Sequence, residues 1–137
     1  MDALLKLRRL AEHHERVARL ELANAERDRV AQEEVVTETA TAIRTALGSQ
    51  SVDPDDHYHR HGYALRMEMA RRGAERRLVE RQRDVGLKRE AMTVAAREKG
   101  TLDKLYELRE AAQNAELSRV ENQHLDEAGL MGWWRRD

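Results

Sequence analysis

The first 47 residues follow a helical pattern of apolar and polar positions. From Asp2 to Leu47 the sequence contains no glycine or proline. Apolar residues recur there at steps of three and four, which places them along one stripe of a helix: Leu7, Leu10, Val17, Leu20, Ala31, Val35, Ala42, Ile43 and Ala46. Asn24 and Arg27 interrupt this stripe. We therefore predict a helix over residues 2–47 that buries an imperfect apolar stripe.

A short polar stretch separates this helix from a second one. Gly48 follows the last periodic residue and suits the left-handed conformation that commonly ends helices. The segment Asp53-Pro54-Asp55-Asp56 is typical of a helix start. Its first aspartate can accept bonds from free backbone N–H groups, proline fits the first helical position, and the later acids face the positive end of the helix dipole. A turn at residues 48–53 between two helices predicts an antiparallel hairpin.

The second predicted helix covers residues 54–128. One face follows a strict seven-residue repeat that resembles the a and d positions of a coiled coil, with cations admitted: Ala74, Leu78, Arg81, Val85, Lys88, Met92, Ala95, Lys99 and Leu102. Four glycines fall inside this helix, and each costs ~1 kcal/mol against alanine, so we expect bends: Gly62, Gly73, Gly86 and Gly100.

The last nine residues, 129–137, carry Trp133 and Trp134 and are expected to form a disordered tail. Docking on a partner or at a membrane interface is the alternative for this tail. The fold class is therefore all-α. Residues 1–137 form a single domain, a long antiparallel two-helix coiled-coil hairpin with a longer second helix.

The two predicted helices differ in length. At 1.5 Å per residue they are ~70 Å and ~110 Å long, so a turn at 48–53 places residue 1 opposite residue ~100. Residues 101–128 then have no partner in the hairpin, although they keep apolar side chains: Leu102, Leu105, Leu108, Ala112, Leu117, Val120 and Leu125. An unpaired helix with such residues is a candidate for partner binding. Fraying, or pairing in a homodimer, are the alternatives.

Composition and charge agree with long helices that bury narrow seams. Charged residues make up 37% of the chain, aromatic residues only 4%, and phenylalanine is absent. The net charge is −1 with both signs interleaved, whereas a dedicated nucleic-acid surface clusters Lys and Arg. The absence of cysteine excludes disulfides and Cys-based zinc sites. No apolar run reaches the ~20 residues needed to cross a bilayer, and the start lacks a signal-peptide layout, so a cytoplasmic location is expected.

Candidate chemistry is sparse. The run His57-Tyr-His-Arg-His61 lies beside three acids and looks like a metal site, but a spacing of two spreads the rings around a helix, so a solvated helix start is expected instead. His13 and His14 are adjacent and diverge. A two-helix hairpin has no pocket to shift carboxylate pKa values. We expect no catalytic residue, no metal and no cofactor. The basic stretch 70–77 leaves nucleic-acid binding as a weaker alternative.

Two parts of the sequence resemble a known family. One is the start, Leu4 to Glu12; the other comprises Arg97-Glu98-Lys99, the segment 102–109 (Leu-Asp-Lys-Leu-Tyr-Glu-Leu-Arg) and the segment 121–127, which ends in Asp126-Glu127. These segments resemble FliJ proteins, which are flagellar export proteins with YscO as the injectisome counterpart. The chain length, the hairpin order and the lack of cysteine agree with this resemblance.

The resemblance implies a non-enzymatic accessory protein of the type III export apparatus, cytoplasmic and peripheral to the inner membrane. The family hairpin is similar to the coiled coil of a rotary ATPase central stalk. It binds the hexameric export ATPase, the membrane export gate and free export chaperones, and takes no small molecule. Membrane association would occur only through these partners. A generic coiled-coil scaffold or dimerising rod is the alternative function.

The residues expected to bind partners come from two arguments. When the chain is aligned with the family starting from Arg97-Glu98-Lys99, the resemblance implies a partner-facing stretch on the second helix. This stretch falls at Met67, Arg71, Ala74 and Leu78. It also marks Asp126 and Glu127 at the family-like end. The length argument adds the apolar residues of the unpaired helix: Leu102, Leu105, Leu117, Val120 and Leu125.

Overall fold

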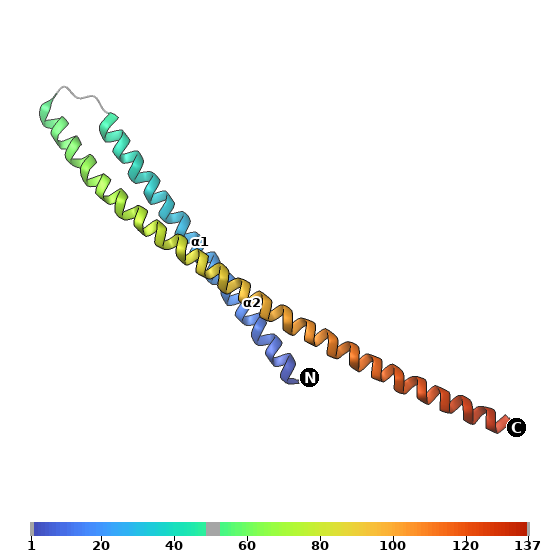
Figure 1. Ribbon diagram of the computed structural model, residues 1–137. Helices are drawn as coiled ribbons and strands as arrows, with labels where there is room; N and C mark the ends of the chain where they lie inside the picture. Colours follow the sequence, from blue (N-terminus) through green and yellow to red (C-terminus); the bar gives the residue numbers. More distant parts are fainter. Residues whose placement is uncertain (1, 49–52, 137) are drawn as a thin grey trace. The chain divides into compact units, whose positions relative to one another are not determined.

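A computed structural model describes residues 2–48 and 53–136, which form two helices (Figure 1). Helix α1 is Asp2–Gly48 and helix α2 is Pro54–Arg136. The all-α fold with two packed helices and a longer second one is confirmed. Residues 49–52 of the predicted turn lie outside the described residues. Neither helix, over the described ranges, contains a stretch apolar enough to span a bilayer.

The start of α2 has the predicted cap. Asp53 Oδ1 accepts a hydrogen bond from the Asp55 backbone N–H at 3.0 Å, and the Asp53 carbonyl accepts one from the His57 N–H at 3.1 Å. Asp55 and Asp56 occupy the first turn, where they face the positive end of the dipole. These contacts fix the first turn of α2 at Pro54.

The other helix ends differ from the prediction. Gly48 is the last residue of α1, and no glycine in the described ranges has a positive φ, so the expected left-handed cap is wrong. Helix α2 continues past residue 128, through Gly129 and Gly132, to Arg136. Residues 129–136 are therefore helical and not a tail, because a glycine weakens a helix by only ~1 kcal/mol and does not block its backbone bonds.

The described residues group into two compact units. One unit is Glu15–Ala95, in which α1 and α2 run antiparallel side by side (Figure 1). Gln32 Nε2 donates to the Ala74 carbonyl at 3.0 Å, and further along, Lys88 Nζ lies 3.3 Å from Glu21 Oε2. The buried apolar residues of this unit are small: Ala18, Ala25, Ala64, Ala74, Val85 and Ala95. Small side chains let two helix backbones approach closely, so the core is a narrow seam.

The face of α1 that packs on α2 differs from the predicted stripe over residues 4–35, whereas Ala42, Ile43 and Ala46 are half-buried as predicted. Leu7 is 52% exposed and Leu20 is 60% exposed, and Leu10, Val17 and Val35 are exposed as well. The buried apolar residues of α1 instead recur every seven positions: Leu4, Ala11, Ala18 and Ala25. These residues of α1 have the same heptad period as the buried face of α2, so the two helix faces can stay in contact over several turns.

The predicted seven-residue stripe of α2 is confirmed with one exception. Each of its members is buried or half-buried except Arg81, which is exposed. Lys88 remains on the stripe because its ammonium reaches Glu21 at the edge of the seam, with 35% of its side chain exposed. Long cationic side chains can cover apolar surface with their methylenes while the charged end stays in water.

The other unit comprises residues 2–14 of α1 and residues 96–136 of α2. Leu4 and Ala11 are its buried apolar residues. Arg8 Nε donates to Asp103 Oδ1 at 2.7 Å, and the Arg8 guanidinium carbon lies 4.7 Å from the Tyr106 ring centroid. Tyr106 is the last half-buried residue of this packed stretch.

Pairing with α1 therefore reaches about one and a half turns beyond the predicted limit near Gly100. The reason lies in the register of the hairpin, because Gln32 of α1 meets Ala74 of α2. Residues 53–59, at the start of α2, are exposed and take no part in the seam. This unequal start shifts every later pairing toward higher residue numbers on α2.

Gly86 offers a test of the helical seam. It is exposed in the middle of α2, and a Cβ added there would meet nothing within 4 Å. Gly86→Ala should therefore raise the free energy of unfolding by ~0.5–1 kcal/mol, since glycine loses more backbone entropy on folding. Urea unfolding followed by circular dichroism measures this. The matched control is Ala91→Gly at an exposed position of the same helix, which should lower the free energy of unfolding by a similar amount. A lower free energy of unfolding for Gly86→Ala than for the parent would contradict the prediction.

Candidate protein-interaction site

The most exposed apolar surface of the unit formed by residues 2–14 and 96–136 lies on α2 after Tyr106. We call residues 107–135 the free segment. Within it only Val120 and Gly132 are half-buried, and the rest are exposed. Its large exposed apolar side chains are Leu108, Leu117, Leu125, Leu130, Met131, Trp133 and Trp134. Exposed apolar surface of this extent on one helix marks a surface for another macromolecule.

Arg8 fixes the base of the free segment. The side chain donates to Asp103, one turn before the segment begins, and stacks over Tyr106, the residue directly before the segment. The hydrogen bond to Asp103 is the main reason that the pKa of Arg8 is raised above its ordinary value. A second carboxylate, Glu12 Oε1, lies 4.0 Å from Arg8 Nε. Two carboxylates and one aromatic ring thus hold the arginine at the point where the paired part of α2 ends.

The free segment is acidic as well as apolar. It carries six carboxylate residues against three arginines. Glu116 and Arg119 form an ion pair at 2.8 Å, and this hydrogen-bonded contact lowers the pKa of Glu116 and raises the pKa of Arg119. The excess negative charge favours a partner whose surface is basic.

The free segment and its base contain most of the residues expected from the length argument. Leu105, Leu117 and Leu125 are exposed, and Leu125 is the most exposed of the three at 69%. Asp126 and Glu127 are exposed beside it. Leu102 and Val120 are half-buried, and Leu102 precedes Tyr106 in the packed stretch.

The other expected stretch lies on the seam. Met67, Arg71 and Leu78 are half-buried on the face of α2 that packs against α1, and Ala74 is only 1% exposed. A partner cannot touch Ala74 while the two helices are packed. The geometry gives these four residues a packing role.

Arg71 shows how a charge is kept on this seam. Its Nε donates to Glu68 at 3.1 Å and its Nη1 donates to Glu75 at 2.9 Å. The bond from Arg71 is the main cause of the lowered pKa of Glu68, and the bond to Glu68 likewise raises the pKa of Arg71. Arg72 adds a contact of 3.7 Å to Glu68. The basic stretch 70–77 is thus partly neutralised by acids of its own helix, which weakens the nucleic-acid alternative.

The exposed leucines of α1 were assigned to the wrong face by the sequence argument. Leu7 and Leu10 face solvent in the unit that holds the free segment. The signal that identifies the buried face is the seven-residue spacing of Leu4, Ala11 and the later alanines. Side-chain size predicted that the leucines of α1 are buried, whereas the seven-residue spacing predicts that the alanines are buried.

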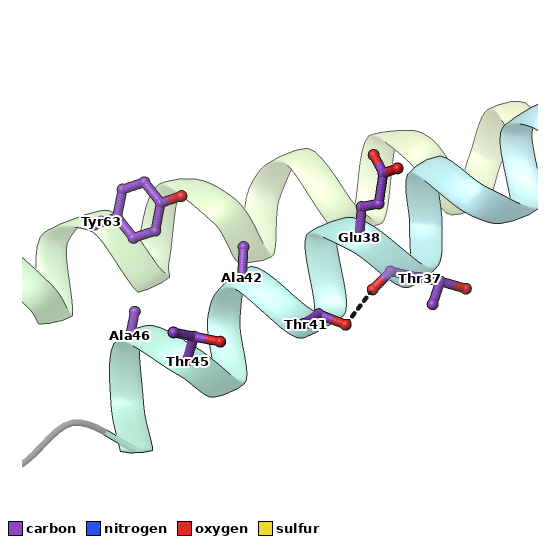
Figure 2. A pocket seen from close by; sticks show the side chains of 7 residues that line it. All are labelled: Thr37, Glu38, Thr41, Ala42, Thr45, Ala46 and Tyr63. Carbon is purple, nitrogen blue, oxygen red and sulfur yellow. Dashed lines mark hydrogen bonds between the residues drawn. The ribbon is translucent and has the colours of Figure 1, made fainter.

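A groove on the unit Glu15–Ala95 is lined by the end of α1 and by one residue of α2, Tyr63 (Figure 2). The lining residues of α1 are Thr37, Glu38, Thr41, Ala42, Thr45 and Ala46. Thr41 Oγ1 donates to the Thr37 carbonyl at 2.9 Å, so this hydroxyl serves its own helix. Glu38 is the one charged residue in this lining.

The side chains that could bind a metal ion do not form a cluster of three or more in the described residues. Over residues 2–48 and 53–136, no three His, Asp or Glu side chains come together in a way that would hold a metal ion. His13 and His14 have ring centroids 6.4 Å apart, as expected for neighbours that diverge.

A family model described as the flagellar FliJ protein matches residues 1–137. No curated protein and no solved structure shows a significant match to the chain.

Proposed function

Since the chain belongs to the FliJ family, it is a non-enzymatic component of the flagellar or type III export apparatus, and we propose that it works there by binding the export ATPase ring, the membrane export gate and export chaperones. The observation that carries this proposal is the free segment. It is a single helix with exposed leucines and tryptophans that no part of its own unit covers.

We assign the ATPase contact to the free segment. A lone helix can enter a ring or a groove that a helix pair would be too wide to enter. Its exposed apolar side chains gain by leaving water, at ~25 cal/mol per Å² of apolar surface. Its excess of carboxylates suits a basic lining on the partner. Leu117 and Leu125 supply the apolar contacts, and Asp126 and Glu127 supply charge.

The proposed location follows from these partners. We place the protein in the cytoplasm at the inner membrane, where it is held by the gate and the ATPase and not by a segment of its own. The exposed surface of the paired helices then remains for the export chaperones.

The test is direct binding to the export ATPase of the same organism. The parent chain should co-elute with the ATPase in size-exclusion chromatography. The double variant Leu117→Asp, Leu125→Asp should bind at least about tenfold more weakly, because each change removes an apolar contact and adds charge repulsion. Circular dichroism should be unchanged, since both positions are exposed.

The control variant is Leu87→Asp, Val94→Asp, which alters two exposed apolar residues of α2 outside the free segment. Its affinity for the ATPase should equal that of the parent. Equal weakening in both variants would show that no special surface exists on residues 107–135. Self-association of the parent that disappears in the first variant would assign the segment to homodimerisation instead.

A further inference from the structure

His57 and His61 lie one helical turn apart at the start of α2. The Nε2 atoms of the two rings are 3.0 Å apart, and the ring centroids are 4.3 Å apart with the planes nearly perpendicular. Both residues are exposed. Without an ion, this contact requires one ring to carry its proton on Nε2 and the other to leave Nε2 unprotonated.

We propose that His57 and His61 form a two-ligand chelate for a divalent transition-metal ion. Histidines at positions i and i+4 share one face of a helix, which is the spacing used by helical metal sites. A metal ion bound to both Nε2 atoms uses the lone pair of each nitrogen, so both rings carry their proton on Nδ1 and the ring protonated on Nε2 in the free pair moves that proton to Nδ1 by exchange with water. The helix backbone places the two side chains on one face, and their rotamers bring the two Nε2 atoms to 3.0 Å.

The distance between the nitrogens selects among metals. With metal–nitrogen bonds of ~2.0–2.1 Å, a 3.0 Å separation subtends about 91–97° at the ion. This angle fits neighbouring positions of a tetragonal or octahedral ion, whereas the tetrahedral geometry of zinc needs nitrogens about 3.3–3.4 Å apart. Cu²⁺ and Ni²⁺ prefer tetragonal nitrogen and oxygen ligands, and Cu²⁺ stands highest in the divalent affinity series. The site therefore favours Cu²⁺, then Ni²⁺, then Zn²⁺.

The surroundings suit a weakly held, solvent-accessible ion. Asp53, Asp55 and Asp56 bring three carboxylates to the same end of the helix, which offsets the repulsion of a cation by the positive end of the dipole. Because the described residues hold no cluster of three ligands, the protein supplies two nitrogens and water fills the remaining positions. His59 takes no part, since its ring packs toward Tyr58 at 5.9 Å between centroids.

The experiment is calorimetric titration of the full-length, untagged chain with CuCl₂, NiCl₂ and ZnCl₂ in a non-chelating buffer at neutral pH. We expect affinity in the order Cu²⁺, Ni²⁺, Zn²⁺. Supporting residues around metal ligands commonly change affinity about 10–100-fold. The loss of a ligand in His61→Gln should therefore weaken Cu²⁺ and Ni²⁺ binding at least about tenfold. The control His59→Gln should bind like the parent.

A second readout separates a chelate from general surface binding. Because an ion that binds only the folded helix stabilises it, Ni²⁺ should raise the Tm of the parent and of His59→Gln but not of His61→Gln. The electron paramagnetic resonance spectrum of the Cu²⁺ complex should show two equivalent nitrogens. Absence of binding, or equal binding by His61→Gln and the parent, would overturn the proposal.

Discussion

A chain that ends at residue 110 should remain a folded hairpin but lose its binding to the export ATPase. The cut keeps the Arg8 contacts with Asp103 and Tyr106, which close the packed part of the unit. It removes Leu117, Leu125 and both tryptophans, all of them exposed. Removing several central contacts of an interface commonly costs more than 2 kcal/mol, so the affinity should fall at least about 30-fold.

Two measurements are needed to interpret this truncation. Circular dichroism and urea unfolding should show that the truncated chain is as stable as the parent, because almost every deleted residue is exposed. The matched control is a truncation after residue 128, which keeps Leu117, Leu125, Asp126 and Glu127 and removes only the Trp-containing end; most of the affinity should remain. Full binding by the chain ending at residue 110 would place the interface on the paired helices.

The period of the buried positions, more than their hydrophobicity, determines the fold. On α2 the seven-residue repeat that includes the buried Ala74, Val85 and Ala95 identified the buried face from sequence alone. On α1 the same rule would have selected Ala11, Ala18 and Ala25, but the larger leucines drew the prediction to another face. Hydrophobicity is a poor guide here because the seam is built from small residues, while several leucines stay in water.

The ends of the helices depend on contributions that a sequence pattern does not weigh. Pro54 and its flanking aspartates marked one end correctly, because capping is local chemistry. Gly129 and Gly132 suggested an end that the helix passes through. The sequence also predicted too short a paired region. The hairpin register depends on which residues meet across the seam, and helix lengths alone do not determine it.

The candidate site was only partly accessible to sequence reasoning. Helix lengths pointed to an unpaired segment on α2, and Leu117 and Leu125 are exposed there as that argument requires. Asp126 and Glu127, which the resemblance marked, are exposed in the same segment. The resemblance placed Met67, Arg71, Ala74 and Leu78 on a partner-facing surface. These residues lie on the seam, and their contact with a partner stays a prediction. The sequence argument weighed the spacing of two within the histidine run and so did not predict the contact between His57 and His61, which are four apart.

The narrow seam leads to a second strong expectation, a loss of stability when Ala74 is enlarged. Ala74 is 1% exposed, and its carbonyl accepts the hydrogen bond from Gln32 across the seam. A leucine there has no space between the helices and should push them apart. Overpacking of this kind costs ~1–3 kcal/mol, and the loss of the hydrogen bond adds ~0.5–1.5 kcal/mol.

The matched control is Ala91→Leu, which makes the same change at an exposed position of α2. Because alanine and leucine have similar helix propensities, it should alter the free energy of unfolding by no more than ~0.5 kcal/mol. Urea unfolding measured by circular dichroism compares both variants with the parent. A spin-label pair at exposed Glu21 and Arg89 should report a wider distance distribution for Ala74→Leu than for Ala91→Leu. If Ala74→Leu is as stable as the control, the two helices do not pack closely at this position, and the register set by Gln32 is wrong.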